Sequence, residues 1–133
     1  MLATVPAQAG DQKQLVTIVT SANAQTQLMA MVLTMQAVKQ GVSVHILLCG
    51  DAGDIALKKA PTTMTTPQKP KGMSPQSMMR MIMAKTDTKV EVCAIYLPNK
   101  AVEISALLDG ITPANPAEMA GRLIADDTQI MSF

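Results

Sequence analysis

The sequence predicts an α/β protein whose mainly parallel sheet of about five strands carries helices on both faces. Short apolar segments rich in β-branched residues alternate with helix-like segments along the chain, which is the pattern of parallel strands joined by right-handed crossovers. The apolar runs are nearly unbroken, as in strands that are covered on both faces. A length of 133 residues favours one domain with its own core, which we place at 14–133.

In the first half of this domain, turn and capping residues mark where the predicted elements begin and end. Strands are predicted at 14–20 and 42–48, with a helix at 26–40 between them. Residues 21–23 offer turn and N-cap chemistry, and Gly41 ends the helix as a C′ glycine. The helix is expected to place Leu28, Val32, Met35 and Lys39 on one side, with Met29, Leu33 and Gln36 beside them. A short helix at 55–60 follows, and 61–75 reads as a long exposed loop.

In the second half, a helix is predicted at 74–85, where Ser74 is the N-cap and Pro75 occupies the first helical position. A strand at 89–95 comes next, and 99–107 forms a short helix or turn. The chain ends with a brief strand at 111–112, a helix at 116–125 and a closing strand at 128–133.

Composition excludes several kinds of partner. The formal net charge is +1 and only 2% of residues are aromatic, so we expect no nucleic-acid partner. The apolar runs are too short to span a bilayer, so no membrane partner is expected. No cofactor motif is present, because Gly50-Asp51-Ala52-Gly53 is neither GxGxxG nor a P-loop. The two cysteines match no zinc or CxxC spacing, and no metal is predicted there.

Residues 1–13 are predicted to be a flexible N-terminal segment. Ala7-Gln8-Ala9 resembles the small-x-small end of a signal peptide, but no basic region or long apolar run precedes it in the sequence. We expect a cytoplasmic protein; the alternative is a periplasmic protein in which Ala7-Gln8-Ala9 ends a signal peptide.

Both cysteines lie where ligands usually bind such sheets. Three loops should leave the carboxyl edge of the sheet, at 21–23, 49–51 and 93–99, and ligands bind beyond that edge. Cys93 is the leading candidate, because it ends a strand and Lys100 nearby would favour a reactive thiolate. Cys49 is a secondary candidate; either thiol could instead be a small buried hydrophobe. His45, the only histidine, lies mid-strand and is expected to be buried or at an interface, too far from Cys93 for a hydrolytic pair.

The 12 methionines allow two interpretations. Met73, Met78, Met79, Met81 and Met83 lie close together, and thioethers prefer Cu(I). Packing of a core or an interface is the more common use of methionine.

Taken together, these segments resemble the DsrE/DsrF-like sulfur-relay family, which includes the DsrE and TusD sulfurtransferase subunits. The resemblance covers about 14–133 and is most specific at Val90-Glu91-Val92-Cys93, followed by the basic Lys100. Further similarity is found in the loop Pro70-Lys71-Gly72, at Leu108-Asp109-Gly110-Ile111 and in the closing segment 128–133.

The resemblance implies a flavodoxin-like fold and a function. By it, Cys93 would accept a persulfide sulfur from a donor protein and pass it to an acceptor protein, with assembly as a homo-oligomer, a trimer or hexamer. Lys100, beside Asn99, would supply positive potential, and we add backbone donors at Ser21 and Asn23 as a possible anion cradle. The alternatives are a non-catalytic oligomeric binding module of the same fold and a Met-rich Cu(I)-binding protein.

Two positions depart from the family pattern. Tyr96 stands where some relatives carry a second cysteine, which excludes a disulfide by that route. Ala101 stands where members often have glycine, and alanine enters positive φ less readily, so we expect a differently shaped loop there.

Overall fold

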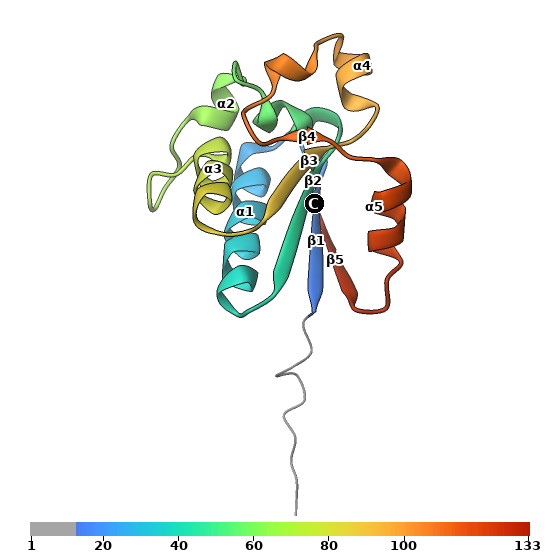
Figure 1. The fold of residues 1–133 in the computed structure, drawn as a ribbon. Coiled ribbons are helices and arrows are strands. Elements are labelled where there is room, and N and C mark those ends of the chain that lie inside the picture. The colour runs from blue at the N-terminus through green and yellow to red at the C-terminus, as the bar shows by residue number, and fades with distance from the viewer. Residues whose placement is uncertain (1–12) are drawn as a thin grey trace, which may run out of the picture.

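The computed structural model describes residues 13–133, and the first twelve residues of the predicted N-terminal segment lie outside this range. The strands alternate with helices in the predicted order (Figure 1). The elements are β1 (Gln14–Val19), α1 (Ala24–Lys39), β2 (Ser43–Leu48), the 3₁₀ helix η2 (Gly50–Ala56), α2 (Thr62–Thr65), α3 (Pro75–Lys85), β3 (Lys89–Val92), α4 (Tyr96–Lys100), the 3₁₀ helix η3 (Ile104–Ala106), β4 (Thr112–Pro113), α5 (Pro116–Leu123) and β5 (Thr128–Ser132).

The five strands form one sheet in the order β4-β3-β2-β1-β5, and all four strand pairings are parallel. The predicted flavodoxin-like α/β class is therefore confirmed. β1 lies between β2 and β5, with Val19 opposite Leu48 and Ile18 opposite Ser132. In the next pair, Leu48 is opposite Val92. Because the three strands are parallel and their last residues are paired in register, the loops after β1, β2 and β3 leave the sheet at one edge.

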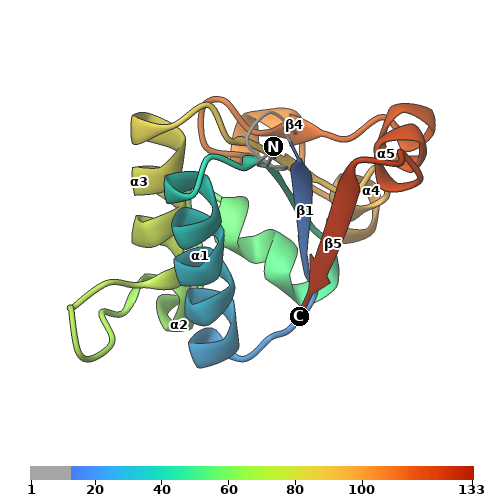
Figure 2. The same cartoon turned by 90° about the horizontal axis from the view of Figure 1, so that it is seen from below.

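Helices cover both faces, as predicted (Figures 1 and 2). α1 and α3 lie side by side on one face, and α5 lies on the other. Right-handed crossovers explain this division: β1, β2 and β3 follow one another in one direction across the sheet, whereas β5 returns to the far side of β1. A connection that reverses direction must cross the opposite face, and α5 is the helix of that connection.

The larger core cluster fills the space between the sheet and the α1–α3 layer. Its fully buried side chains include Met31 of α1, Ile46 and Leu48 of β2, and Met79 and Ile82 of α3. A smaller cluster under α5 consists of Val16, Leu47, Ala114 and Met119. Partly buried Cys93 packs against both clusters, so it lies where the two cores meet at the end of the sheet.

The residue pattern of α1 predicted which side chains share a side of the helix, and the structure shows which side chains face the core. The buried residues are Gln27, Ala30, Met31, Thr34 and Met35, whereas Met29 and Leu33 are exposed. Small and polar side chains turn inward because their polar atoms find partners there: the Thr34 hydroxyl lies 2.8 Å from that of Thr17. Gln27 donates a 2.8 Å hydrogen bond to the Ser21 carbonyl. The more apolar stripe is thereby left on the outer side of the helix.

Several element bounds also differ from prediction. The short helix after β2 is a 3₁₀ helix that starts directly at Gly50, and the expected loop at 61–75 contains α2, whose Met64 is buried. β3 ends at Val92, and helix α4 begins at Tyr96 rather than at 99. The predicted caps are confirmed: Asn23 accepts from the Thr26 N–H at 2.9 Å, and Ser74 caps α3 with Pro75 following.

Candidate functional site

Cys49 and Cys93 meet at the carboxyl edge of the sheet. Each is the first residue after a strand, and the last residues of those strands, Leu48 and Val92, are paired in register. The Cys93 N–H continues the ladder with a 2.9 Å hydrogen bond to the Leu48 carbonyl. The two Cα atoms are 5.1 Å apart, inside the range that a disulfide spans.

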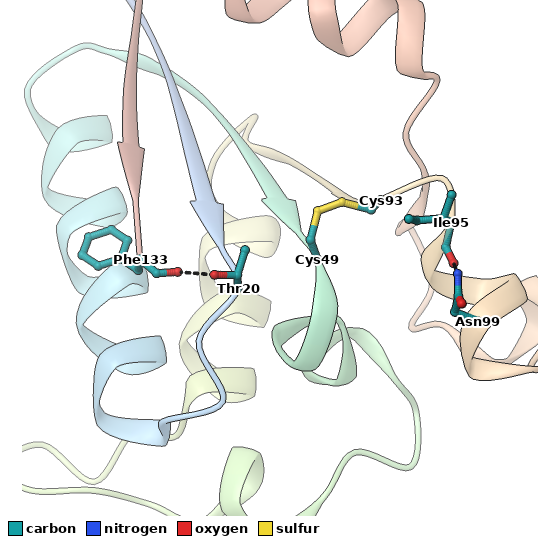
Figure 3. Close-up of a disulfide and its surroundings, with 6 residues drawn as sticks. All are labelled: Thr20, Cys49, Cys93, Ile95, Asn99 and Phe133. Atoms are coloured by element: carbon teal, nitrogen blue, oxygen red, sulfur yellow. Dashed lines mark hydrogen bonds between the residues drawn. A yellow bond between two sulfur atoms is a disulfide. The ribbon is translucent and has the colours of Figure 1, made fainter.

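The two sulfur atoms are joined in a disulfide (Figure 3). The sequence analysis excluded a bridge between Cys93 and position 96, and it weighed Cys49 and Cys93 separately. Sequence spacing gives no sign of this pair, because 44 residues separate the two cysteines. The signal that could have found it is positional: Cys49 directly follows one predicted strand, Cys93 lies near the end of the next, and consecutive parallel strands are usually neighbours.

Both cysteines are partly buried and line a pocket of about 370 Å³ that opens to solvent. Its walls come from the end of β2, the start of η2 and the segment from β3 into α4. The lining residues are Cys49, Gly50, Asp51, Asp54, Cys93, Ile95, Tyr96, Asn99 and Lys100. The site therefore contains the two candidate cysteines and two of the predicted supporting residues, Lys100 and Asn99.

Asp54 organises the polar wall of this pocket. One carboxylate oxygen accepts a 2.5 Å hydrogen bond from the Tyr96 hydroxyl, and the other lies 3.0 Å from the Lys100 amine. Burial, followed by the bond to Asp54 and its charge, raises the pKa of Tyr96 far above its ordinary value of 10.0. The Tyr96 hydroxyl consequently stays protonated at physiological pH and donates its hydrogen bond to Asp54, which is also paired with Lys100.

Gly53 leaves room for the aromatic ring of Tyr96. The residue is buried in η2, and a Cβ added there would overlap three ring carbons of Tyr96. The absent side chain thus allows the aromatic ring to lie directly on the η2 backbone. This contact was not foreseen from the sequence, where Gly53 was considered only as part of a weak anion-loop pattern.

Lys100 and Asn99 stand at the end of α4. The Lys100 side chain is 42% exposed and its amine is paired with Asp54, so its positive charge is partly neutralised within the pocket wall. The Asn99 side chain donates a 2.8 Å hydrogen bond to the Ile95 carbonyl (Figure 3), which stabilises the short helix. Ala101 then ends α4 in the left-handed conformation, with φ of 60°. Ala101 thus adopts positive φ, although alanine enters this conformation less readily than glycine does.

Ser21 and Asn23 do not line this pocket. They leave the same edge of the sheet, but their N–H groups already have partners: the Ser21 N–H donates to the Phe133 carbonyl at 3.3 Å, and that of Asn23 to the Ser21 hydroxyl at 3.0 Å. The neighbouring Thr20 hydroxyl also donates to Phe133 (Figure 3). These residues cap α1 and hold the C-terminal residue.

His45 is separated from the thiols, as predicted. It is four residues before Cys49 on β2, about 13 Å at the rise of a parallel strand. Its Nε2 lies 2.6 Å from a Glu91 carboxylate oxygen, and its side chain is buried. Burial lowers the pKa of His45 below its ordinary value of 6.5, and the bond to Glu91 opposes that effect. The chain's histidine therefore cannot act as a base for Cys93.

A second cavity, of about 1060 Å³, runs along the outer side of α1 and α3. We call it the α1–α3 groove. Its floor includes Met29, Val32, Met78 and Met81, and four lysines stand among its lining residues: Lys39, Lys69, Lys71 and Lys85. Met29 is 51% exposed. The groove is an apolar surface with a basic rim.

The methionine cluster divides between core and groove. Met79 is fully buried in the core, Met78 is a buried core residue that also lines the groove, and the partly exposed Met81 lines the groove. The thioethers of α3 are thus used as packing atoms on two different surfaces. Among residues 13–133, no group of three or more His, Cys, Asp and Glu side chains is arranged to hold a metal ion. No helix in the same range is long and apolar enough to cross a membrane.

Comparison with known proteins supports the fold. No family model and no curated protein sequence matches the chain. Among solved structures, the ychN protein from E. coli superposes with a TM-score of 0.70 at 19% identity, over 92% of this chain and 99% of that one. MTH1491 from Methanobacterium thermoautotrophicum, a protein of unknown function, has a TM-score of 0.64 at 10% identity, over 92% of this chain and 100% of its own. The chain therefore shares its α/β fold with these two proteins over nearly their whole length.

Proposed function

We propose that the chain is a sulfur-relay protein of the DsrE/DsrF-like kind, with Cys93 as the sulfur carrier. The observation that supports this most directly is the position of Cys93: partly exposed at the carboxyl end of β3, in an open pocket with the Lys100 amine. The sequence resemblance around Val90–Cys93 points the same way, and the shared fold is consistent with it.

The relay would run on the reduced form, in which the Cys49–Cys93 bond has been opened by a thiol reductant. The Cys93 thiolate attacks the outer sulfur of a donor persulfide, R–S–SH, forming Cys93–S–SH and releasing the donor thiolate RS⁻. An acceptor thiolate then attacks the outer sulfur of Cys93–S–SH and regenerates the Cys93 thiolate. Sulfur donor and acceptor proteins are the partners that this cycle requires.

The test uses the reduced protein and one equivalent of sodium tetrasulfide, an inorganic sulfane-sulfur donor. We expect a mass increase of about 32 Da, one sulfur atom, located on the peptide that contains Cys93. Cys93→Ser should carry no such adduct, and Cys49→Ser serves as the matched control that keeps Cys93. Failure of both Cys93-containing proteins to take up sulfur, when a reactive control protein is labelled, would reject the function.

A second candidate function is that of an oligomeric binding module, and the α1–α3 groove favours it. A second exposed apolar region carries acidic residues: Ile124 and Ile130 are 81% and 52% exposed, and the exposed Asp126 and Asp127 lie between them in the sequence. We call this the α5–β5 patch. An apolar patch with acidic neighbours fits an apolar groove with a basic rim.

Such a contact would join different surfaces of two copies. Head-to-tail contacts of this kind close into rings when the rotation between copies is suitable, which is consistent with a trimer or a hexamer built from rings. If assembly alone is the function, Cys93→Ser will leave every partner interaction intact, whereas the relay function predicts that sulfur transfer is lost while assembly remains.

The relay requires a compartment in which Cys49 and Cys93 are kept reduced. Cytoplasmic thiols are kept reduced, whereas disulfides persist in the periplasm. We therefore place the working protein in the cytoplasm, with the periplasm as the alternative that would keep Cys49–Cys93 oxidised. Trapping thiols with a mass-tagging maleimide in intact cells, followed by electrophoresis, distinguishes the two: two tags per chain support the cytoplasmic relay, and no tag supports a permanent structural bond.

A further inference from the structure

Cys49 reaches the carrier sulfur without any movement of the backbone. The two Cα atoms are 5.1 Å apart on strands whose ends are paired in register, and the sulfur atoms are bonded in the oxidised form. After reduction, the same two strands hold the Cys49 thiol beside Cys93. A second thiol fixed next to a persulfide carrier has a direct chemical consequence.

We infer that Cys49 is a resolving cysteine, which discharges sulfur from Cys93 when no acceptor takes it. This inference rests on the proposed function, and it adds a second reacting residue to that site. The Cys49 thiolate attacks the inner sulfur, Sγ of Cys93, in Cys93–S–SH. A bond forms between the two cysteine sulfur atoms, the bond to the outer sulfur breaks, and the outer sulfur leaves with its electron pair as HS⁻.

The step balances without any oxidant from outside. The outer sulfur is reduced from the sulfane level to hydrosulfide, and the two cysteines together are oxidised from a thiolate and a persulfide to a disulfide. A dithiol reductant must then supply two electrons and two protons to regenerate the Cys49 and Cys93 thiols. The Cys49–Cys93 disulfide of the structure has the same bond that this discharge reaction would form.

The pocket lets the outer reactants enter and the product leave. Cys49 and Cys93 are both partly exposed, and the pocket of about 370 Å³ that they line opens to solvent. Hydrosulfide can diffuse out, and a reductant can reach the disulfide. A structural disulfide sealed in the core would permit neither.

Two competing attacks then decide the fate of the sulfur. An acceptor thiol that attacks the outer sulfur carries it onward, whereas Cys49 attacking the inner sulfur releases it as HS⁻ and closes the site. The carrier would thus hold sulfur only briefly, and an oxidised carrier could not be reloaded until a dithiol had reduced it. Cys49 sets the time available for transfer.

The test follows the lifetime of the adduct. The protein is reduced with dithiothreitol, desalted without oxygen, treated with one equivalent of sodium tetrasulfide and desalted again before the clock starts. In the wild-type chain, we expect the adduct of about 32 Da to disappear while a Cys49–Cys93 disulfide and one hydrosulfide per chain appear. In Cys49→Ser, the adduct should last roughly tenfold longer or more, since no internal thiol can attack it.

Two further variants serve as controls for the effect of Cys49→Ser. Cys49→Ala repeats the test without a hydroxyl, and its melting curve checks that the pocket still folds. Asp109→Asn, at an exposed residue that does not line the cysteine pocket, should discharge sulfur as the wild-type chain does.

The outcomes separate the two proposals. Equal adduct lifetimes in wild type, Cys49→Ser and Cys49→Ala would overturn the role of Cys49 while leaving Cys93 as a carrier. Absence of an adduct from all of these proteins would reject the carrier function, and the role of Cys49 with it.

Discussion

The Tyr96 hydroxyl donates a 2.5 Å hydrogen bond to the Asp54 carboxylate, and this bond ties α4 to η2. Both elements follow strand ends, so the bond fixes one wall of the cysteine pocket to the other. Asp54 is also paired with Lys100 at 3.0 Å. The geometry around the sulfur atoms therefore depends on a polar cluster that contains no sulfur.

Tyr96→Phe should destabilise the protein although it keeps the aromatic ring on Gly53. The partly buried Asp54 would lose its neutral donor, and a hydrogen bond to a charged group contributes about 1.5–3 kcal/mol. Urea unfolding of the reduced protein, in which the disulfide does not mask the effect, measures the change. Asn99→Ala, which removes an exposed bond within α4, is a control expected to change stability less. A Tyr96→Phe variant as stable as wild type would show that Asp54 relies on Lys100 and water instead.

The Gly53–Tyr96 contact makes a separate prediction. Gly53→Ala should destabilise the fold by about 1–3 kcal/mol, because the new methyl group overlaps the Tyr96 ring. In a Tyr96→Leu background the same change should have a smaller effect, since the aromatic ring is gone. Unfolding free energies of the two single variants and the double variant give the coupling directly. Additive effects would mean that the overlap is relieved elsewhere.

In the reduced protein, the cationic and anionic residues of the pocket wall should have opposite effects on the reactivity of the Cys93 thiol. Lys100→Gln removes a cation and is expected to slow alkylation of Cys93 by iodoacetamide at pH 7, whereas Asp54→Asn removes an anion and frees Lys100, which should accelerate it. Changes of about threefold each way correspond to roughly half a unit in thiol pKa. Both variants are made in a Cys49→Ser background, so that one thiol is measured. Equal rates in both would mean that the wall charges are screened from the sulfur.

His45 should make stability fall on acidification. Its pKa is lowered, chiefly by burial, so below about 6.5 the unfolded chain binds a proton that the folded chain resists. The free energy of unfolding is therefore fully retained above the ordinary pKa and declines as the pH falls toward the folded value, by at most about 1.4 kcal/mol per pH unit for one proton. Urea unfolding between pH 7.5 and 5 measures the slope. His45→Gln should flatten it; an unchanged slope would assign the effect to carboxylates.

Sequence reasoning was most successful where a local signal decides the structure. Unbroken apolar runs predicted β1 and β2, and Asn23 and Ser74 marked helix starts through capping chemistry. The same reasoning placed Cys93 at a strand end, because Pro98 and Asn99 mark the chain's departure from the sheet. These features depend on residues that are neighbours in the chain.

Features that depend on distant residues were missed. The Cys49–Cys93 pair follows from the register of β2 with β3, and the Asp54 cluster joins residues more than 40 positions apart. The core-facing side of α1 was not assigned from the sequence, because hydrophobicity alone cannot reveal that Thr34 has a buried partner in Thr17. Because Thr34 and the other inward-facing residues occupy the side of α1 that packs on the sheet, Met29 and Leu33 lie on the exposed side.

That exposed stripe is the basis of the assembly prediction. If the α1–α3 groove of one copy receives the α5–β5 patch of the next, Met29→Lys and Ile124→Lys should each convert the oligomer to a monomer. Mixed together, the two variants should form a one-to-one complex, because one retains an intact groove and the other an intact patch. Light scattering after gel filtration measures both results. Ile104→Lys, at an exposed isoleucine outside both surfaces, is the control. Monomeric wild-type protein would exclude the interface.

The end of α4 yields the most local prediction. Ala101 adopts φ of 60° and ψ of 42°, a conformation in which a Cβ meets the following carbonyl oxygen and costs about 1–2 kcal/mol. Ala101→Gly removes that penalty but adds backbone freedom to the unfolded chain, so a net stabilisation of about 0.5–1 kcal/mol is expected. Ala120→Gly, at an exposed position inside α5, should destabilise by a similar amount because glycine is a poor helix former. The pair of substitutions separates backbone geometry from the general effect of glycine. Thermal unfolding of the two variants beside the wild-type chain measures both signs, and destabilisation by Ala101→Gly would contradict a left-handed residue at this turn, directly after Lys100 of the cysteine pocket.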